Sequence, residues 1–123
     1  QQFFLVKRYI ENKYKTRIIK CNTIRNKANI ALSSRNLLLK KNHLKNVSKI
    51  VNELFLFKKK INKQKKINLI FKNKIKDLKK RYKIDIEYLE LRKLDNLKKS
   101  FNTKNANLFI AYYINKVRLI DNL

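Results

Sequence analysis

The apolar residues of this chain recur mainly at helical spacing. Near the start, four of them follow one another at four-residue intervals, Val6, Ile10, Tyr14 and Ile18. Such spacing places side chains on one face of an α-helix. Similar patterns run over residues 50–61 and 67–78, and the phase is lost over residues 62–66, where we interpret a turn. The first two thirds of the chain are therefore predicted to be helical.

Two further helices are predicted from residues that cap helix starts. Asp85 precedes one apolar set, Tyr88, Leu89, Leu91 and Leu94, and Asn102 or Thr103 precedes another, Leu108, Ile110, Ala111 and Ile114. Asp, Asn and Thr accept hydrogen bonds from the free backbone N–H groups at a helix start. A strand over residues 84–90 remains the alternative, because apolar and polar residues alternate there.

The composition favours helices throughout. The 123 residues include no Gly and no Pro, the two strongest helix breakers, whereas Lys and Leu are good helix formers. We therefore expect an all-α fold, with a long basic helical arm over residues 1–62 and a small compact helical domain over residues 67–123.

The charge divides the chain into two unlike parts. Residues 1–83 carry 26 Lys and Arg and 3 acids, whereas residues 84–123 carry 7 and 5, and the whole chain has a formal charge of +25. A+T-rich coding would raise Lys and Asn everywhere, but it does not explain why acids are nearly absent from the first part alone. Because so large a charge opposes compaction, a polyanion is the simplest partner.

The remaining composition points to an intracellular compartment. Abundant Lys, Asn and Ile indicate A+T-rich coding and favour an organelle genome or an A+T-rich nucleus. The single cysteine, Cys21, fits a reducing compartment. The longest apolar stretch, residues 108–114, is far shorter than the roughly 20 residues of a membrane span, and no apolar block typical of a signal peptide follows the basic start.

Catalytic chemistry finds little support in the sequence. His43 lies among lysines with no acid nearby, so we interpret it as an exposed or RNA-facing side chain rather than a general base. Cys21 is interpreted as a half-buried apolar residue on a helix. Asp85, Glu87 and Glu90 are explained by a helix cap and surface charge. We expect no enzyme, cofactor, metal site or small-molecule substrate.

The basic arm is interpreted as an RNA-binding surface. A thin basic helix with few apolar anchors can lie in the crevices of a large folded RNA and touch phosphates on several sides. The residues predicted to contact RNA are Lys7, Arg8, Tyr9, Lys13, Lys15, Arg17, Lys20, Arg25, Lys27, Arg35, Asn36, Lys40, Lys41, Lys45 and Lys49. Two alternatives remain: a basic amphipathic protein on an anionic membrane surface, and a DNA-coating nucleoid protein.

Several short motifs resemble one family in order and spacing. Residues 75–87, Ile-Lys-Asp-Leu-Lys-Lys-Arg-Tyr-Lys-Ile-Asp-Ile-Glu, resemble a segment of the bacterial-type large-subunit ribosomal protein L-twenty family, with Asp77 in place of a family Gly. Residues 17–20, 34–36 and 108–111 resemble further segments of that family.

The resemblance implies a non-enzymatic structural role in the large ribosomal subunit. It implies an extended helix in large-subunit ribosomal RNA, a helical domain on the subunit surface, neighbouring ribosomal proteins as partners and a role in subunit assembly. With the A+T-rich coding, it favours a mitochondrial ribosome.

Overall fold

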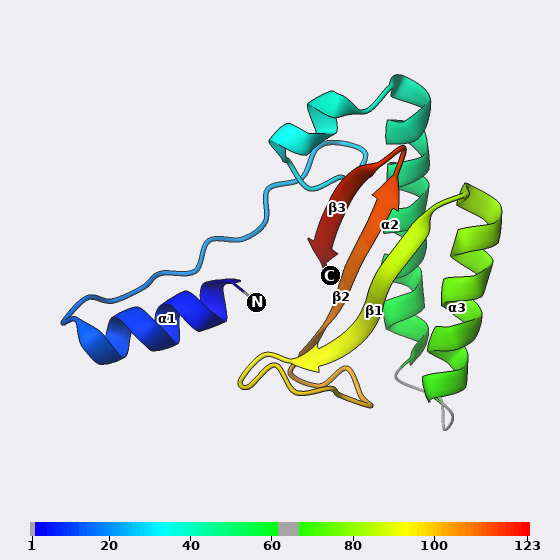
Figure 1. Cartoon of the computed structure of the whole chain (residues 1–123). Helices are drawn as coiled ribbons and strands as arrows, with labels where there is room; N and C mark the ends of the chain where they lie inside the picture. The colour runs from blue at the N-terminus through cyan, green and yellow to red at the C-terminus, as the bar shows by residue number, and fades with distance from the viewer. Residues whose placement is uncertain (1, 62–66) are drawn as a thin grey trace.

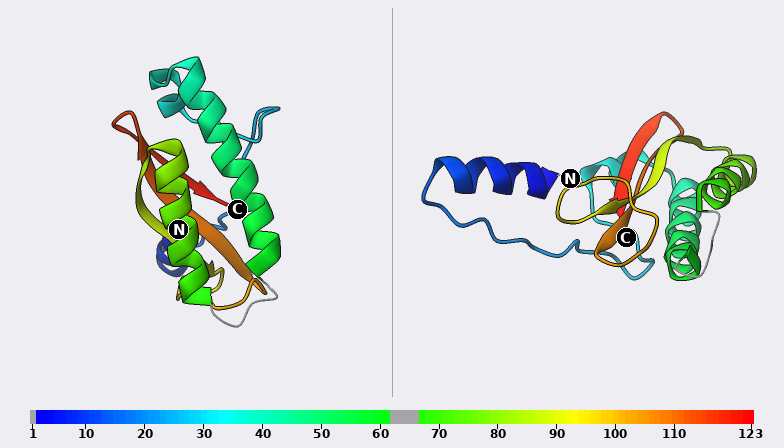
Figure 2. Two further views of the ribbon diagram at one scale, coloured as in Figure 1. Left: turned by 90° about the vertical axis from the view of Figure 1, so that its right-hand side faces the viewer. Right: turned by 90° about the horizontal axis from the view of Figure 1, so that it is seen from below.

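The chain folds into helices packed on a small antiparallel sheet. The computed structural model describes residues 2–61 and 67–123. Its elements are α1 (Gln2–Lys13), the 3₁₀ helix η1 (Ser34–Leu38), α2 (Lys41–Ile61), α3 (Ile67–Tyr82), β1 (Asp85–Lys93), β2 (Ala106–Ile114) and β3 (Val117–Asn122) (Figure 1). Figure 2 shows α2 and α3 side by side over one face of the sheet.

The helices at residues 50–61 and 67–78 are confirmed. In α2, Val47, Ile50, Val51 and Leu54 are buried and recur at helical spacing, so one face of the helix packs on the sheet. Phe57 of α2 meets Phe71 of α3 edge to face, with ring centroids 5.3 Å apart. The turn predicted at residues 62–66 lies outside the described residues.

The prediction of an all-α fold is wrong. The two segments predicted as capped helices form the strands β1 and β2, and the sheet order is β1-β2-β3, antiparallel throughout. In β1 the buried residues Ile86, Leu89 and Leu91 face the core, and a register shift between Ile86 and Tyr88 realigns the two halves of the strand. The alternative interpretation of residues 84–90 as a strand is correct.

Turns form here without glycine, which explains the error. Among residues 2–61 and 67–123, six residues other than glycine adopt positive φ: Asn29, Lys83, Leu97, Asn105, Asn115 and Lys116. Asn115 and Lys116 alone connect β2 to β3, at φ 48° and 65°. Positive φ at both central residues is what the commonest two-residue hairpin turn requires. The missing glycines therefore did not exclude a sheet.

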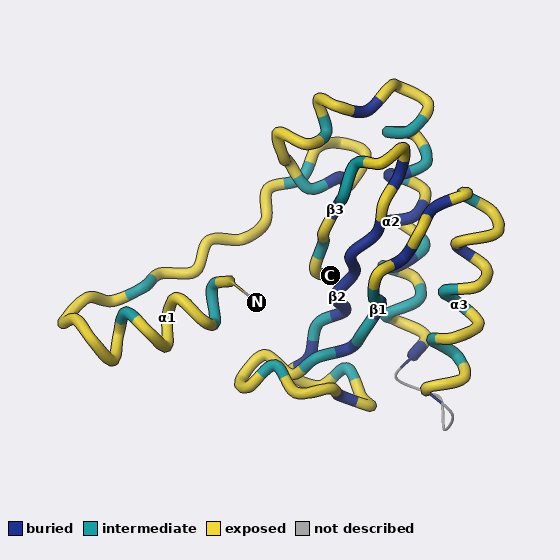
Figure 3. Tube along the Cα trace, in the orientation of Figure 1, coloured by how far each residue is buried: buried dark blue, intermediate teal, exposed yellow. Residues whose placement is uncertain are grey.

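The first predicted helix is shorter than expected. The apolar stripe extends to Ile18, but α1 ends at Lys13 and the chain then runs extended towards residue 24. No residue of α1 is buried, and Figure 3 shows α1 and the segment after it almost wholly exposed. We call residues 2–24 the arm.

One hydrophobic core spans the rest of the molecule. It includes residues from Ile30 to Leu123 and is formed mainly by α2, Leu78 of α3 and the inner face of the sheet. The predicted division into residues 1–62 and 67–123 stays a prediction of the sequence.

Candidate functional site

A tight turn over residues 25–31 leads into the candidate site. Arg25 and Ala31 form an isolated antiparallel bridge, so the segment folds back on itself. The side-chain Oδ1 of Asn26 accepts a hydrogen bond from the backbone N–H of Ile30 at 3.0 Å. Asn favours such turns because its side chain replaces a backbone partner.

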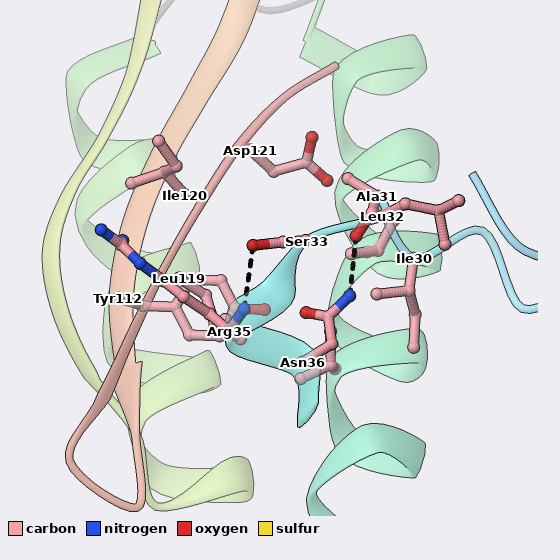
Figure 4. A pocket seen from close by; sticks show the side chains of 12 residues that line it. Ile30, Ala31, Leu32, Ser33, Arg35, Asn36, Tyr112, Leu119, Ile120 and Asp121 are labelled. Carbon is pink, nitrogen blue, oxygen red and sulfur yellow. Dashed lines mark hydrogen bonds between the residues drawn. The ribbon is translucent and has the colours of Figure 1, made fainter. Parts of the chain in front are cut away.

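The segment Ser-Ser-Arg-Asn at residues 33–36 follows that turn and starts η1. The Ser33 hydroxyl accepts a hydrogen bond from the backbone N–H of Arg35 at 3.2 Å and caps the helix. Asn36 donates from Nδ2 to the carbonyl of Ala31 at 2.9 Å (Figure 4). These two bonds fix the start of η1, which contacts β3.

A cavity of about 360 Å³ lies between this segment, α2 and the β2–β3 hairpin. Its lining combines apolar side chains with a few polar ones, as ligand pockets commonly do. The lining residues are Ile30, Ala31, Leu32, Ser33, Arg35, Asn36, Val47, Val51, Tyr112, Leu119, Ile120 and Asp121.

Two charged side chains line the cavity, Asp121 and Arg35, and they differ in whether an opposite charge neutralises them. Asp121 accepts a bidentate pair of hydrogen bonds from Arg25, both 2.8 Å long, so its charge is neutralised. Arg35 is exposed and donates from Nη1 to the carbonyl of Arg118 at 3.0 Å. Among the described residues, no carboxylate pairs with Arg35. The cavity therefore presents one cation that is available to an anion.

Tyr112 lies on the sheet side of the cavity. It is 2% exposed, and burial raises the pKa of its phenol above the ordinary value. The hydroxyl is therefore neutral at physiological pH and does not act as a base. The cavity can hold and orient an anionic ligand, because guanidinium groups match the geometry of phosphate and carboxylate oxygens.

Most of the predicted RNA-contacting residues lie away from this cavity. Four are on α1, Lys7, Arg8, Tyr9 and Lys13, and three are in the extended part of the arm, Lys15, Arg17 and Lys20. Lys27 lies in the turn, Lys40 precedes α2, and Lys41, Lys45 and Lys49 are exposed on α2. Of the predicted residues, Arg35 and Asn36 line the cavity, and Arg25 lies beside it because it binds the lining residue Asp121. A binding role for the other residues stays a prediction.

Sequence reasoning missed the residues that the hairpin contributes. Tyr112 lies on a strand that was predicted as a helix, and Asp121 lies on the strand after it, 96 residues beyond Arg25. One signal was available, because Asp121 is one of only 8 acids in a chain with 33 cations. With cations in such excess, each acid is expected to pair with one of them.

His43 and Cys21 differ from their interpretation. His43 is half-buried in the first turn of α2, and its Nδ1 is buried without a hydrogen-bond partner in the described part of the chain. Cys21 is exposed in the arm, because the region around it is extended and not the helix that was predicted.

The three carboxylates of β1 all have cationic partners. Asp85 pairs with Lys79 at 2.7 Å, Glu87 with Arg118 at 2.8 Å and Glu90 with Lys99 at 3.1 Å. Across residues 2–61 and 67–123, no group of three or more His, Cys, Asp or Glu side chains is placed to bind a metal ion. None of the described helices is long and apolar enough to span a membrane.

Comparison with known proteins identifies a family of ligases. The family model for pantoate-beta-alanine ligase matches residues 1–123. The chain is 34% identical over 125 residues to the pantothenate synthetase of Ruthia magnifica subsp. Calyptogena magnifica, covering 100% of this chain and 44% of that protein. It is 37% identical over 115 residues to the pantothenate synthetase of Endomicrobium trichonymphae, covering 89% and 39%.

Solved structures show the same fold. The pantothenate synthetase of Thermus thermophilus superposes with a TM-score of 0.83 at 21% identity, over 99% of this chain and 45% of that one. The pantoate-beta-alanine ligase of Francisella tularensis, complexed with beta-gamma ATP and beta-alanine, has a TM-score of 0.56 at 30% identity, over 97% and 36%. This chain thus spans less than half the length of these relatives.

These matches correct the predictions of function. The resemblance to ribosomal protein L-twenty is wrong, and so are the ribosomal role, the ribosomal RNA and ribosomal protein partners, and the mitochondrial ribosome, because the relatives are bacterial ligases. The expectations of no enzyme and no small-molecule substrate are likewise wrong. The membrane and nucleoid alternatives have no support. The ribosomal interpretation rested on the basic composition, which was interpreted as a binding signal, and on short motifs that were individually unspecific.

Proposed function

Because this chain belongs to the pantoate-beta-alanine ligase family, we propose that it forms part of an enzyme that joins pantoate to β-alanine with ATP. Forming an amide from a carboxylate and an amine requires an activated carboxylate. ATP supplies the activation when a carboxylate oxygen of pantoate attacks a phosphorus atom of ATP, because a P–O bond of the triphosphate then breaks and the phosphate groups beyond it leave. The amine of β-alanine next attacks the acyl carbon, the bond between that carbon and the phosphate-linked oxygen breaks, and the phosphate-bearing fragment leaves with that oxygen while the amine loses a proton.

The exposed Arg35 guanidinium at the cavity carries this proposal. Arg35 donates one hydrogen bond, to the carbonyl of Arg118, and has no carboxylate partner among the described residues. Its position is set by the Ser33 cap and by the contact with β3. We assign Arg35 the role of binding a phosphate group of ATP, where a fixed guanidinium stabilises the charge that develops on the transferred group.

The arm offers a contact surface for the rest of such an enzyme. Leu5, Tyr9, Ile19 and Ile24 are between 59% and 77% exposed. Exposed apolar residues gathered on one segment are typical of interaction sites. Since the chain covers 44% of its relative, we propose that the arm packs against the remaining part of the ligase, which supplies the other substrate contacts.

Titration calorimetry of ATP into the chain tests the role of Arg35. We expect saturable binding that weakens by at least about tenfold in Arg35→Ala, because a charge-assisted hydrogen bond contributes about 1.5–3 kcal/mol. Arg17→Ala is the matched control, since it removes the same charge from an exposed arm position outside the cavity. Equal weakening in both variants would show that only the net charge attracts ATP, and it would contradict the proposal.

A further inference from the structure

One partly buried ion pair joins the turn before the site to the last strand. Arg25 stands at the start of the 25–31 turn, and Asp121 lies on β3, 96 residues later in the sequence. Their side chains are 18% and 7% exposed, so the pair is only partly open to water. The two bonds are parallel and equal in length, at 2.8 Å.

Arg25 has several further contacts, and each is with a different element. It donates to the carbonyl of Asn29 within the turn at 2.9 Å and to the carbonyl of Asn122 at the end of β3 at 3.0 Å. Its guanidinium also lies 5.3 Å from the ring centre of Phe55 on α2. One side chain therefore ties the turn to the sheet and to α2.

The turn held by Arg25 determines where the Ser33–Arg35 segment lies. Ala31 is paired with Arg25 across the bridge, and Leu32 donates to the carbonyl of Ile24 at 3.0 Å. Ser33 follows directly. At its other end the segment is attached to the same strand, because Arg35 donates to the carbonyl of Arg118. Strand β3 thus holds the 25–36 segment at two of its own residues, Arg118 and Asp121, which are three positions apart on the strand.

We propose that Arg25 and Asp121 are positioning residues that hold the 25–36 segment so that Arg35 can bind an anion in the cavity. The proposal rests on the assigned role of Arg35. Both oxygens of Asp121 are engaged by Arg25, and the donors of Arg25 point to Asp121 and to backbone carbonyls. The pair therefore acts through Arg35 rather than by touching the ligand.

Electrostatics and positioning predict opposite effects for Asp121→Asn. This change removes a negative charge from the cavity wall, so electrostatic attraction alone would strengthen anion binding. If Asp121 positions the segment, the same change weakens binding, because Arg25 loses its bidentate partner and the turn loosens. Arg25→Lys leaves the net charge unchanged but cannot reproduce the planar fork of hydrogen bonds.

The experiment titrates ATP into the full chain while amide and guanidinium signals of residues 33–36 are followed by NMR. Asp77→Asn is the matched control, since it breaks another bidentate carboxylate–arginine pair, with Arg81 on α3 (Nε to Oδ1 at 2.7 Å), without touching the 25–31 turn or β3. We expect Asp121→Asn and Arg25→Lys to weaken ATP binding about tenfold and to broaden or shift the signals of residues 33–36 before ATP is added. Asp77→Asn should keep the wild-type affinity.

The outcomes separate this proposal from the role of Arg35. If Arg35→Ala loses affinity while Asp121→Asn and Arg25→Lys bind as tightly as wild type or more tightly, the positioning role is overturned and the phosphate site stands. If Arg35→Ala binds normally, the assigned phosphate site itself fails. Should Asp121→Asn not fold, Arg25→Lys decides, because it retains the charge and one hydrogen bond to Asp121.

Discussion

Left-handed backbone without glycine is the most unusual feature at the scale of single residues. Lys83, Leu97 and Lys116 adopt φ of 50°, 58° and 65°. A side chain with a Cβ atom loses roughly 1 kcal/mol in this region, which Gly avoids. Each of these positions is therefore a place where glycine would favour the native turn.

Lys116→Gly should stabilise the fold by about 0.5–1 kcal/mol, because Asn-Gly is the preferred pair for this hairpin turn. Lys80→Gly provides the opposite control: Lys80 is exposed within α3, and Gly in a helix is destabilising by about 0.5–1 kcal/mol relative to Ala. Urea unfolding of both variants measures the two effects. A loss of stability in Lys116→Gly would show that the Lys116 side chain does not destabilise this turn, and it would contradict the prediction.

A charge cluster between α2 and α3 centres on Glu53. Arg81 donates to both its oxygens at 2.7 and 2.5 Å, Lys74 donates at 2.8 Å, and the Tyr82 hydroxyl also donates to it. The Arg81 hydrogen bonds above all lower the pKa of Glu53 from 4.5 to about 2, although burial opposes them. The folded protein therefore stabilises the charged form of Glu53 more than the unfolded chain does.

Glu53→Gln should lower the free energy of unfolding by about 1–2 kcal/mol at pH 7, a value reduced for partial solvent screening. Because the folded pKa lies below the unfolded one, this contribution is complete above pH 4.5 and disappears as the pH falls towards 2. Urea unfolding at pH 7 and pH 2.5 measures the difference. Glu11→Gln, whose partner Lys7 is 3.8 Å away on exposed α1, should change little at either pH. A difference that does not depend on pH would contradict the assigned pKa.

At the scale of elements, hydrophobic periodicity predicted the helices better than the strands. The α2 pattern is unambiguous, because its apolar residues repeat over several turns. Residues 84–90 alternate for too short a run to decide between strand and helix, and β2 is apolar on both faces, which removes its alternation. The missing glycines then favoured helices, although Asn and Lys form the turns instead.

Leu54 of α2 is fully buried in the core, whereas Leu56 on the same helix is 58% exposed. Leu54→Ala should therefore lower the free energy of unfolding by about 2–5 kcal/mol, through lost burial and the cavity left behind. Leu56→Ala should cost less than about 0.5 kcal/mol. Thermal or urea unfolding of both variants tests the packing of α2 on the sheet, and similar losses would contradict it.

At the scale of the whole molecule, the candidate site could be predicted only in part. Arg25, Arg35 and Asn36 were selected from the sequence as contacts of a polyanion, and all three lie at the cavity or beside it. Their partners on β2 and β3 could not be found, because the hairpin had not been predicted. Nor does net charge distinguish an RNA-binding surface from a basic enzyme.

The charge of +25 should make stability depend strongly on salt. Because like charges repel in the compact state and salt screens them over about 10 Å at 0.1 M, we expect the Tm to rise by about 4 °C between 20 and 200 mM NaCl. Differential scanning calorimetry measures this shift. A falling Tm would mean that the ion pairs, which salt weakens, outweigh the repulsion.

The central claim is that this chain supplies a functional part of a pantoate-beta-alanine ligase, with Arg35 at the ATP site. The most direct measurement replaces the matching 44% of the Ruthia magnifica pantothenate synthetase with this chain and follows pantothenate formation from pantoate, β-alanine and ATP. We expect an active chimera that loses at least about tenfold in rate with Arg35→Ala and little with Lys80→Ala, which removes an exposed cation of α3 outside the cavity. A folded chimera without activity, or one indifferent to Arg35→Ala, would contradict the claim.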